Sequence, residues 1–225
     1  MKIASIGLSL LLLAGLFSCN KEDFNYAEGT VGRSKVVNFP LISIKGTKIL
    51  AIQQGNAYTD PGATATINGA TVTYRTSTTI TSSTAPGIYP ITYTATNSDG
   101  FSATDFRIVV VVSNTIWNNA DANANDFSGV YLRAATGVTS TWTKLAPGTY
   151  AVENPGGASV GAGFSVIVQN ASGTSIRMPV QSSPFFGATI SGSSETYSPG
   201  PPAQVTWVFN DPPAYGTSVR IFVKQ

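Results

Sequence analysis

The stretch PGIYPITYTATNSDG, residues 86–100, decides how the chain folds. From residue 88 to residue 96, aromatic and aliphatic side chains alternate with proline and threonine. Such alternation is typical of a strand with one buried face, and the NSDG that follows, residues 97–100, has the composition of a turn. Residues 101–112 then return with the apolar run IVVVV at their end. The sequence therefore predicts an antiparallel β-hairpin.

The hairpin closes a predicted first domain that spans residues 35–113. Upstream of it, residues 36–39, 41–44 and 48–52 are short extended pieces, and no segment keeps a helical period. A domain of about 80 residues built from short strands has the size of an immunoglobulin-like β-sandwich. The predicted fold class is therefore all-β, and it begins with an Ig-like β-sandwich.

Three motifs make this expectation more specific: GNAYTDPGA at residues 55–63, PGIY at 86–89 and ITYTATNSDG at 91–100. In order and spacing they resemble the bacterial Ig-like domain of surface proteins and pesticidal crystal proteins. The resemblance implies a domain that serves as a spacer or an adhesion module and carries no catalytic residues.

Individual residues of these motifs have structural interpretations. Tyr89, two residues after Gly87, fits a tyrosine corner, in which a phenol at the start of a strand bonds back to the chain. Tyr93 is expected in the core, and ligand stacking is the weaker alternative for both tyrosines. The DPG at residues 60–62 predicts a turn, with a metal-ligand role for Asp60 as its weaker alternative.

Residues 116–225 are predicted to form a second antiparallel β-sandwich-like domain. Its candidate strands are short and alternating or apolar, and most are bounded by Gly, Pro, Asn or Ser. The order of these strands in a sheet cannot be read from the sequence. The candidate strands span residues 130–133, 140–143, 148–152, 164–169, 175–178, 205–209 and 219–223.

All three tryptophans lie in this second half. Sugars present C–H faces that pack on aromatic rings, and a domain with few charges suits a neutral ligand. Trp142 stands between two threonines and Trp117 beside an Asn-rich segment, so exposure and core packing are both open for them, whereas Trp207 is expected in the core. The glycan-binding residues predicted here are Trp117, Trp142, Tyr131 and Tyr215.

The spacing Asp121-x-Asn123-x-Asn125 is similar to the start of a calcium loop, where alternate side chains converge on one ion. The rest of the loop pattern fails, because Asp126 stands where glycine is required and Leu132 where a bidentate glutamate belongs. A hydrogen-bonded Asx loop is therefore favoured over calcium. The sequence predicts no cofactor.

The composition excludes several classes of function. The chain has 225 residues, 11% of them charged, a formal net charge of +2, no histidine and one cysteine. Without an imidazole there is no Ser-His or Cys-His pair and no Cys/His zinc site. So small a net charge argues against nucleic acid as a partner. The carboxylates of the second half show no spacing that would pair them across a glycosidase cleft, so a non-catalytic protein is predicted.

Residues 1–18 have the pattern of a secretory signal, with a lysine at position 2 and an apolar run too short to span a bilayer comfortably. They end in LFS before Cys19, which resembles a bacterial lipobox, although Phe17 replaces the usual small residue. A lone cysteine in an exported protein has no disulfide partner, and acylation explains it. After the cysteine, Lys21, Glu22 and Asp23 resemble the export signal of Bacteroidetes-type surface lipoproteins.

Residues 19–34 are the predicted lipidated tether, which anchors the chain in the outer membrane on the extracellular side. The resemblance implies a glycan-binding accessory lipoprotein of a polysaccharide-utilisation system. The implied partners are the membrane, through N-terminal acyl chains, an oligo- or polysaccharide, and an outer-membrane transporter complex. The alternative is a structural or adhesive Ig-like protein that binds another surface protein.

Overall fold

The computed structural model describes residues 27–31, 34–159, 163–183, 187–210 and 218–225. They fall into two units, the first ending at Asn38 and the second running from Phe39 to Gln225. The described part of the first unit contains strands β1 (Thr30–Val31) and β2 (Ser34–Lys35), which pair antiparallel. None of the helices in the described ranges is long and apolar enough to cross a membrane.

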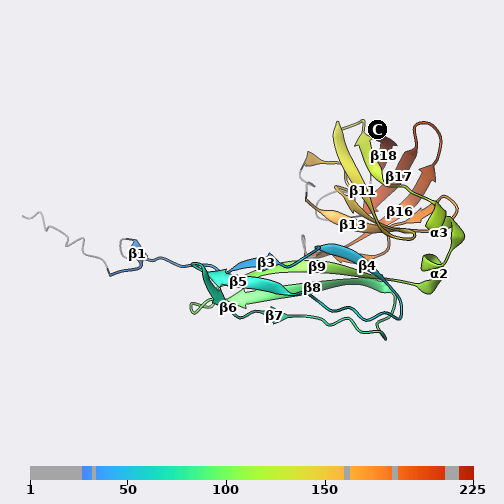
Figure 1. Cartoon of the computed structure of the whole chain (residues 1–225). Helices are drawn as coiled ribbons and strands as arrows, with labels where there is room; N and C mark the ends of the chain where they lie inside the picture. The colour runs from blue at the N-terminus through green and yellow to red at the C-terminus, as the bar shows by residue number, and fades with distance from the viewer. Residues whose placement is uncertain (1–26, 32–33, 160–162, 184–186, 211–217) are drawn as a thin grey trace, which may run out of the picture. The chain divides into compact units, whose positions relative to one another are not determined.

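The second unit begins with a sandwich of two sheets (Figure 1). One sheet has the order β3-β5-β6 and the other the order β4-β9-β8-β7. Strand β4 runs parallel to β9, and the other pairs are antiparallel. The bounds are β3 Leu41–Ile44, β4 Ile49–Gln53, β5 Ala63–Ile67, β6 Ala70–Val72, β7 Arg75–Thr76, β8 Gly87–Thr96 and β9 Ser102–Val112.

Strands β8 and β9 form the predicted hairpin, which is confirmed over its whole length. Their register runs from Gly87 opposite Val111 to Thr96 opposite Ser102. Every second residue of β8 from Ile91 onward is buried, in agreement with the alternation in the sequence. This buried face packs against the other sheet and closes the Ig-like core.

The apolar run at the end of β9 is continuous because both faces of this strand end are covered. Residues 109 and 111 belong to the Ig-like core, and the residues between and beside them belong to a cluster that both domains share. The two domains therefore pack together within one compact unit. The buried members of the shared cluster are Ile108, Val110 and Val112 from β9 and Ala146, Ala151 and Ile167 from the second domain.

The second domain is built on one antiparallel sheet of nine strands. Its order, β14-β13-β12-β11-β10-β18-β17-β16-β15, is that of two meanders joined where β10 pairs with β18. The bounds are β10 Gly129–Arg133, β11 Val138–Ala146, β12 Thr149–Glu153, β13 Ser165–Ser172, β14 Ser175–Arg177, β15 Gln181–Ser183, β16 Ala188–Ser198, β17 Gln204–Asn210 and β18 Val219–Lys224.

The two edges of this sheet approach each other, so that the sheet encloses one core. The Gln181 amide on β15 accepts a hydrogen bond from the Ile167 N–H on β13 (2.8 Å) and donates one to the Ile167 carbonyl (3.0 Å). The Glu195 carboxylate on β16 accepts a bond from the Met178 N–H, just beyond β14 (3.0 Å). The predicted all-β fold class is confirmed.

Four elements of this part of the chain are absent from the sequence prediction: β15, β16 and the helices α2 (Asn114–Trp117) and α3 (Ala120–Ala124). Strand β16 is mostly serine, threonine and glycine, with one fully buried residue, Ile190, so it lacks a hydrophobic signal. The helices are short and depend on their N-caps, Ser113 and Asn119, rather than on an apolar period.

Gly148 allows the helical connector between β9 and β10, which consists of α2 and α3, to pack against the turn between β11 and β12. Its φ is +55°, and a Cβ at this position would lie 2.3 Å from the Asn170 carbonyl oxygen and 2.8 Å from Ile116 Cγ2. Its N–H donates to the Ala122 carbonyl (3.0 Å), and its own carbonyl accepts from the Asn170 N–H (2.8 Å). Only glycine fits this close approach, which fixes α3 to the second domain.

Candidate functional site

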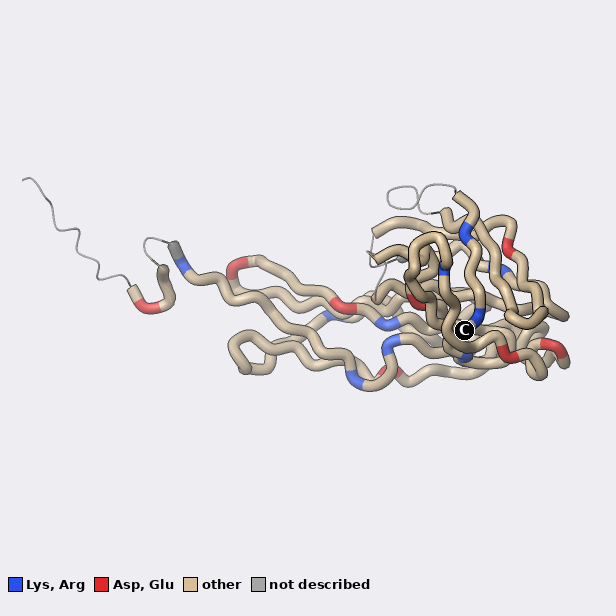
Figure 2. Tube along the Cα trace, turned by 90° about the horizontal axis from the view of Figure 1, so that it is seen from above, with Lys and Arg blue, Asp and Glu red and all other residues tan. Residues whose placement is uncertain are grey.

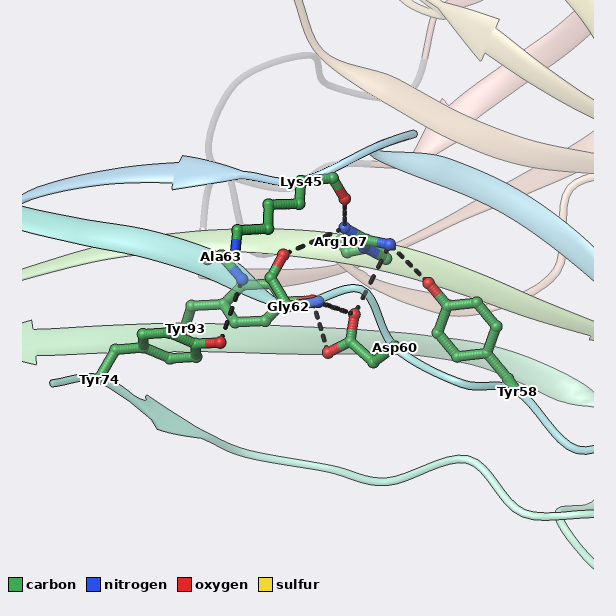
Figure 3. Close-up of polar contacts among 8 residues, drawn as sticks. All are labelled: Lys45, Tyr58, Asp60, Gly62, Ala63, Tyr74, Tyr93 and Arg107. Atoms are coloured by element: carbon green, nitrogen blue, oxygen red, sulfur yellow. Dashed lines mark hydrogen bonds and ion pairs between the residues drawn. The ribbon is translucent and has the colours of Figure 1, made fainter.

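The Ig-like domain contains a buried cluster of polar side chains around Arg107 (Figure 3). Arg107 lies on β9 and is 1% exposed. Its guanidinium donates to the Tyr58 hydroxyl (2.6 Å) and to the Lys45 carbonyl, and its Nη1 lies 3.6 Å from Asp60 Oδ1. Because a buried charge needs partners, these contacts hold the loop that carries Tyr58 and Asp60 against the sheet.

Tyr93 contacts the same carboxylate from β8. Its hydroxyl donates to Asp60 and lies 2.8 Å from each carboxylate oxygen, and the Gly62 N–H donates to Oδ1 (3.0 Å). Burial raises the pKa of the Tyr93 phenol well above its ordinary value, and the hydrogen bond to Asp60 raises it further. The bond from the Gly62 N–H to Asp60 closes an Asx turn at residues 60–62, and protein donors occupy the Asp60 oxygens.

The glycine of this turn permits one more contact. Gly62 has a φ of +73°, and a Cβ there would lie 2.5 Å from the Tyr74 hydroxyl. That hydroxyl accepts a hydrogen bond from the Ala63 N–H (3.2 Å). We refer to Tyr58, Asp60, Tyr93 and Arg107 together as the Arg107 latch, because they fasten the TDPGA motif to the strands.

Tyr89 forms the predicted tyrosine corner. Its hydroxyl donates to the Ala85 carbonyl, four residues earlier, over 2.8 Å. Its ring is partly buried against the Ig-like core, and Tyr93 is 0% exposed. The structural interpretation of both tyrosines is therefore confirmed.

In the second domain, the prediction that Trp142 and Tyr131 bind glycan as exposed rings is wrong. Trp142 is 2% exposed and Tyr131 is 0% exposed. The Trp142 ring stacks on Trp207, with 5.5 Å between centroids, and Tyr131 donates to the Phe127 carbonyl (2.7 Å). Rings in this position build the core and cannot pack against a sugar.

The polar neighbours of Trp142 explain the error. Ser140, on the same face of β11, is itself buried, and its hydroxyl donates to the Glu153 carbonyl (2.7 Å). Lys144, further along this face, donates to the Asn125 carbonyl (2.6 Å). Polar residues beside a tryptophan can thus mark satisfied hydrogen bonds rather than solvent.

The other tryptophans have different positions. Trp117 ends α2 and packs, partly buried, against the shared apolar cluster. Trp207 is 0% exposed, as expected, and its Nε1 donates to the Pro155 carbonyl (2.9 Å). Tyr215 lies outside the described residues. Trp117 is therefore the one predicted ligand-binding aromatic that the described ranges leave partly accessible.

The segment weighed as a calcium loop is engaged in hydrogen bonds within the protein. The Asp121 carboxylate accepts from the Gly173 N–H (2.7 Å), and the Asn125 amide donates to the Gly173 carbonyl (2.5 Å). The Asn123 amide donates to the Asn119 carbonyl (2.9 Å). The predicted Asx loop is wrong, because Asp121 and Asn123 lie in helix α3 and Asn125 is its C-cap. Within the described ranges, no three Asp, Glu or Cys side chains gather as metal ligands.

Each carboxylate of the second domain that the structure describes accepts a backbone N–H. Hydrogen bonds from the Ser128 side chain and backbone lower the pKa of one of them, Asp126. Such carboxylates hold turns and strand ends in place. The pairs are Asp121 with Gly173, Asp126 with Ser128, Glu153 with Gly163 and Glu195 with Met178.

A surface pocket of about 230 Å³ lies over β11 and β12. Asn154 is 5% exposed there, and its amide is engaged with the Thr139 carbonyl (3.3 Å) and the Ala158 N–H (3.2 Å). The groups left for a ligand are hydroxyls and one carboxylate. Sequence reasoning missed this pocket, because no motif joins its lining residues, which are Val138, Thr139, Thr141, Glu153, Asn154 and Ser159.

The outer face of β10 and β18 is apolar. Val130, Val219 and Ile221 are 42%, 57% and 49% exposed. The two strands pair side by side, and β18 pairs on its other side with β17. This face is a second candidate contact surface. The predicted lipidation site and export signal, Cys19, Lys21, Glu22 and Asp23, lie outside the described residues.

The two-sheet sandwich with its tyrosine corner defines the class of the first domain, which is Ig-like. Residues 42–111 match the family model described as the Ig-like domain of bacterial surface proteins. The resemblance drawn from the sequence motifs is therefore confirmed for this part of the chain. Comparison with curated proteins gives no match.

Among solved structures, the chain is similar to the lipoprotein BT2262 from Bacteroides thetaiotaomicron, known from its crystal structure. The alignment covers 83% of this chain and 100% of that one, with 23% sequence identity and a TM-score of 0.43.

Proposed function

We propose that this protein is a non-catalytic lipoprotein of the bacterial cell surface, whose Ig-like domain carries the second β-domain for ligand binding. The observation that carries this proposal is the match of residues 42–111 to the Ig-like domain of bacterial surface proteins. The signal sequence and the lone Cys19 supply export and an acyl anchor. Lys21, Glu22 and Asp23 direct the protein to the outer face of the outer membrane.

The shared apolar cluster supports this display role. Ile108, Val110 and Val112 of β9 are at most 5% exposed, because the second domain covers them. The Gln53 amide also donates to the Asn114 side chain (2.8 Å), which binds the helical connector to β4. A ligand bound to the second domain would therefore be held at a fixed place relative to the Ig-like domain.

The hydrogen bonds of the carboxylates support a binding protein that catalyses no reaction. A glycosidase needs one carboxylic acid and one carboxylate facing each other across a cleft. Asp121, Asp126, Glu153 and Glu195 instead each accept a backbone N–H of the second domain. These side chains are engaged in structural contacts.

The ligand class that we propose is an uncharged polysaccharide, bound at the pocket over β11 and β12. Thr139, Thr141 and Ser159 offer hydroxyls, and Glu153 offers its second carboxylate oxygen, since Oε1 accepts the Gly163 N–H. These groups suit the hydroxyls of a sugar. Since Trp142 is buried, binding here depends on hydrogen bonds. In this role the protein is an accessory to a polysaccharide-utilisation system with its outer-membrane transporter.

The anchor is tested by feeding cells an alkyne-labelled fatty acid. We expect the wild-type protein to take up the label and to sediment with membranes, and Cys19→Ala to lose the label. A Cys19→Ala protein that keeps both properties would contradict the lipoprotein assignment.

Glycan binding is tested by affinity electrophoresis against a panel of plant, host and microbial polysaccharides. We expect at least one polysaccharide to retard the wild-type protein and Thr141→Val to reduce the retardation, because the substitution removes one hydroxyl and keeps the shape. Thr143→Val, further along β11 and outside the pocket lining, is the matched control. Absence of retardation on every polysaccharide would exclude this ligand class.

A second candidate function is favoured by a separate observation, the exposed apolar face of β10 and β18. Apolar patches on soluble domains often mark contacts with other proteins. On this view the partner is another surface protein, such as a subunit of the transporter complex. Cross-linking on intact cells should then recover a partner that Ile221→Lys loses and Thr143→Lys keeps.

A further inference from the structure

We propose that Phe39, Leu41 and Phe101, here called the tip of the Ig-like domain, rest on the lipid surface to which the chain is anchored. The proposal rests on the acylation of Cys19 proposed above. It assigns the lipid headgroup region as the partner of a surface that neither the Ig-like core nor the second domain uses.

The tip consists of three large apolar side chains that are all exposed. Phe39 is 57% exposed, Leu41 is 74% exposed and Phe101 is 45% exposed. The rings of Phe39 and Phe101 contact each other, with 5.3 Å between centroids and 58° between planes. Aromatic rings and leucine on a soluble domain prefer the boundary between headgroups and acyl chains to bulk water.

In the hairpin turn at residues 97–100, beside Phe101, backbone N–H groups already have hydrogen-bond partners within the turn. The Asn97 side-chain oxygen accepts from the Asp99 N–H (3.0 Å) and from the Phe101 N–H (2.8 Å). The Gly100 N–H donates to the Asn97 carbonyl (3.1 Å). A turn whose donors are internally paired loses little when it leaves water. The charge of Asp99 limits the contact to the headgroup depth.

Few charged residues oppose contact between the tip and a membrane. Figure 2 shows charged residues thinly spread along the strands of the Ig-like domain, in keeping with a chain that is 11% charged. Asp99 is the charged residue of the turn next to Phe101. Contact with lipid therefore depends on apolar burial, and we expect it to survive high salt.

The length of the tether favours lipid as the surface that the tip contacts. Cys19 and Phe39 are 20 residues apart (39 − 19). Even fully extended, this segment spans at most about 70 Å. Phe39 is also the first residue of the second unit. The tip is thus the part of this unit that acylation holds nearest to the bilayer.

The direction of β9 fits this placement. Phe101 precedes the first residue of β9, and Ile108, the nearest buried residue of the shared cluster on β9, lies seven residues further on, about 23 Å along a strand. In Figure 1, β9 leads from the turn end of the hairpin to the end where α2 begins. With the tip on lipid, the second domain faces away from the bilayer.

The experiment places an indole at the tip and brings it near brominated lipid, which quenches tryptophan emission at short range. The acylated full-length protein, as wild type, Phe101→Trp and Val219→Trp, is reconstituted on vesicles of phosphatidylethanolamine and phosphatidylglycerol, with or without brominated acyl chains. Val219 is the control because it is similarly exposed, at 57%, on the second domain. Wild-type emission is subtracted to remove the native tryptophans.

We expect brominated lipid to reduce the emission added by Phe101→Trp and to leave that added by Val219→Trp unchanged, at low and at high salt. Vesicles that float with bound protein but quench neither variant would overturn the tip contact and leave the lipoprotein assignment intact. Protein that fails to float would overturn both. An indole at position 101 shielded from acrylamide but not quenched by bromine would show a protein or a second copy on the tip, and would also overturn the proposal.

Discussion

In the Ig-like domain, the largest side chain buried between the sheets is Arg107, whereas in the second domain the interior is filled by Trp142 stacked on Trp207. Both domains are antiparallel for the most part, and both use a tyrosine that bonds to a carbonyl four residues earlier. The first core combines aliphatic residues with the buried polar contacts of Arg107, whereas the second consists mainly of aromatic surface. Two neighbouring all-β domains of one chain thus fill their interiors with different interactions.

The difference teaches what each core controls. The Arg107 latch joins residues that lie far apart in the sequence, since Tyr58 and Arg107 are separated by 49 positions. Its polar bonds are directional, so they position the TDPGA loop as well as stabilise it. The aromatic core contributes buried area with little direction. Four predictions separate these two contributions, and they run from the largest expected effect to the smallest.

Trp207→Ala should have the largest effect. It removes a fully buried ring, its stacking on Trp142 and its hydrogen bond to the Pro155 carbonyl. We expect the free energy of unfolding to fall by about 4 kcal/mol, the usual range for such truncations. Urea unfolding followed by circular dichroism measures it. A loss below about 1 kcal/mol would mean that the aromatic core does not hold the second domain together.

Arg107→Gln should lower the free energy of unfolding by about 3 kcal/mol, because it leaves the Asp60 carboxylate without its buried cation. The three tryptophans all lie in the second half of the chain, so their fluorescence reports on that domain, and circular dichroism reports on both. The shared cluster predicts that both signals shift together. An early transition seen only by circular dichroism would show that the domains unfold independently.

The two matching tyrosine bonds should differ in strength. Tyr131 is 0% exposed, whereas the Tyr89 bond lies in an exposed setting. We expect Tyr131→Phe to lower the free energy of unfolding by about 1.5 kcal/mol and Tyr89→Phe by about 0.5 kcal/mol, the two ends of the range for such bonds. Chemical denaturation of the pair provides the comparison. The reverse order would contradict the burial difference.

The last prediction concerns tyrosine ionisation, which changes the free energy of unfolding only at alkaline pH. Burial raises the pKa of Tyr131, Tyr150 and Tyr93 above the unfolded value of about 10. Folding therefore favours the protonated phenol, so this contribution is complete below about pH 10 and is lost as the pH rises through the folded pKa values. A pH titration of unfolding should show the loss, and Tyr131→Phe should make it shallower. An unchanged slope would exclude Tyr131 as a cause.

Local features of the fold could be predicted from the sequence, whereas long-range features could not. The β8–β9 hairpin and the corner at Tyr89 depend on neighbouring residues, and both are confirmed. The junction of β10 with β18 joins residues about 90 positions apart, such as Leu132 and Val223, and no local pattern marks it. Strand β16 escaped prediction because its side chains are small and polar.

The candidate site was less predictable than the fold. The burial of Trp142 depends on Ser140 having a carbonyl partner on the neighbouring strand, which the sequence does not reveal. In the pocket over β11 and β12, strand pairing brings Thr141 beside Glu153. Side-chain identity could suggest the class of ligand, but the exposed position of each group follows only from the packed structure.

The central claim is that the second domain is displayed outside the cell on a lipid anchor. Cys19 is the only cysteine in the sequence, and the account has it acylated, so Val219→Cys introduces a single free thiol at an exposed position of the second domain. Intact cells carrying this variant are treated with a membrane-impermeant maleimide. We predict labelling without any permeabilisation of the outer membrane. Labelling that appears only after the outer membrane is opened would contradict the claim.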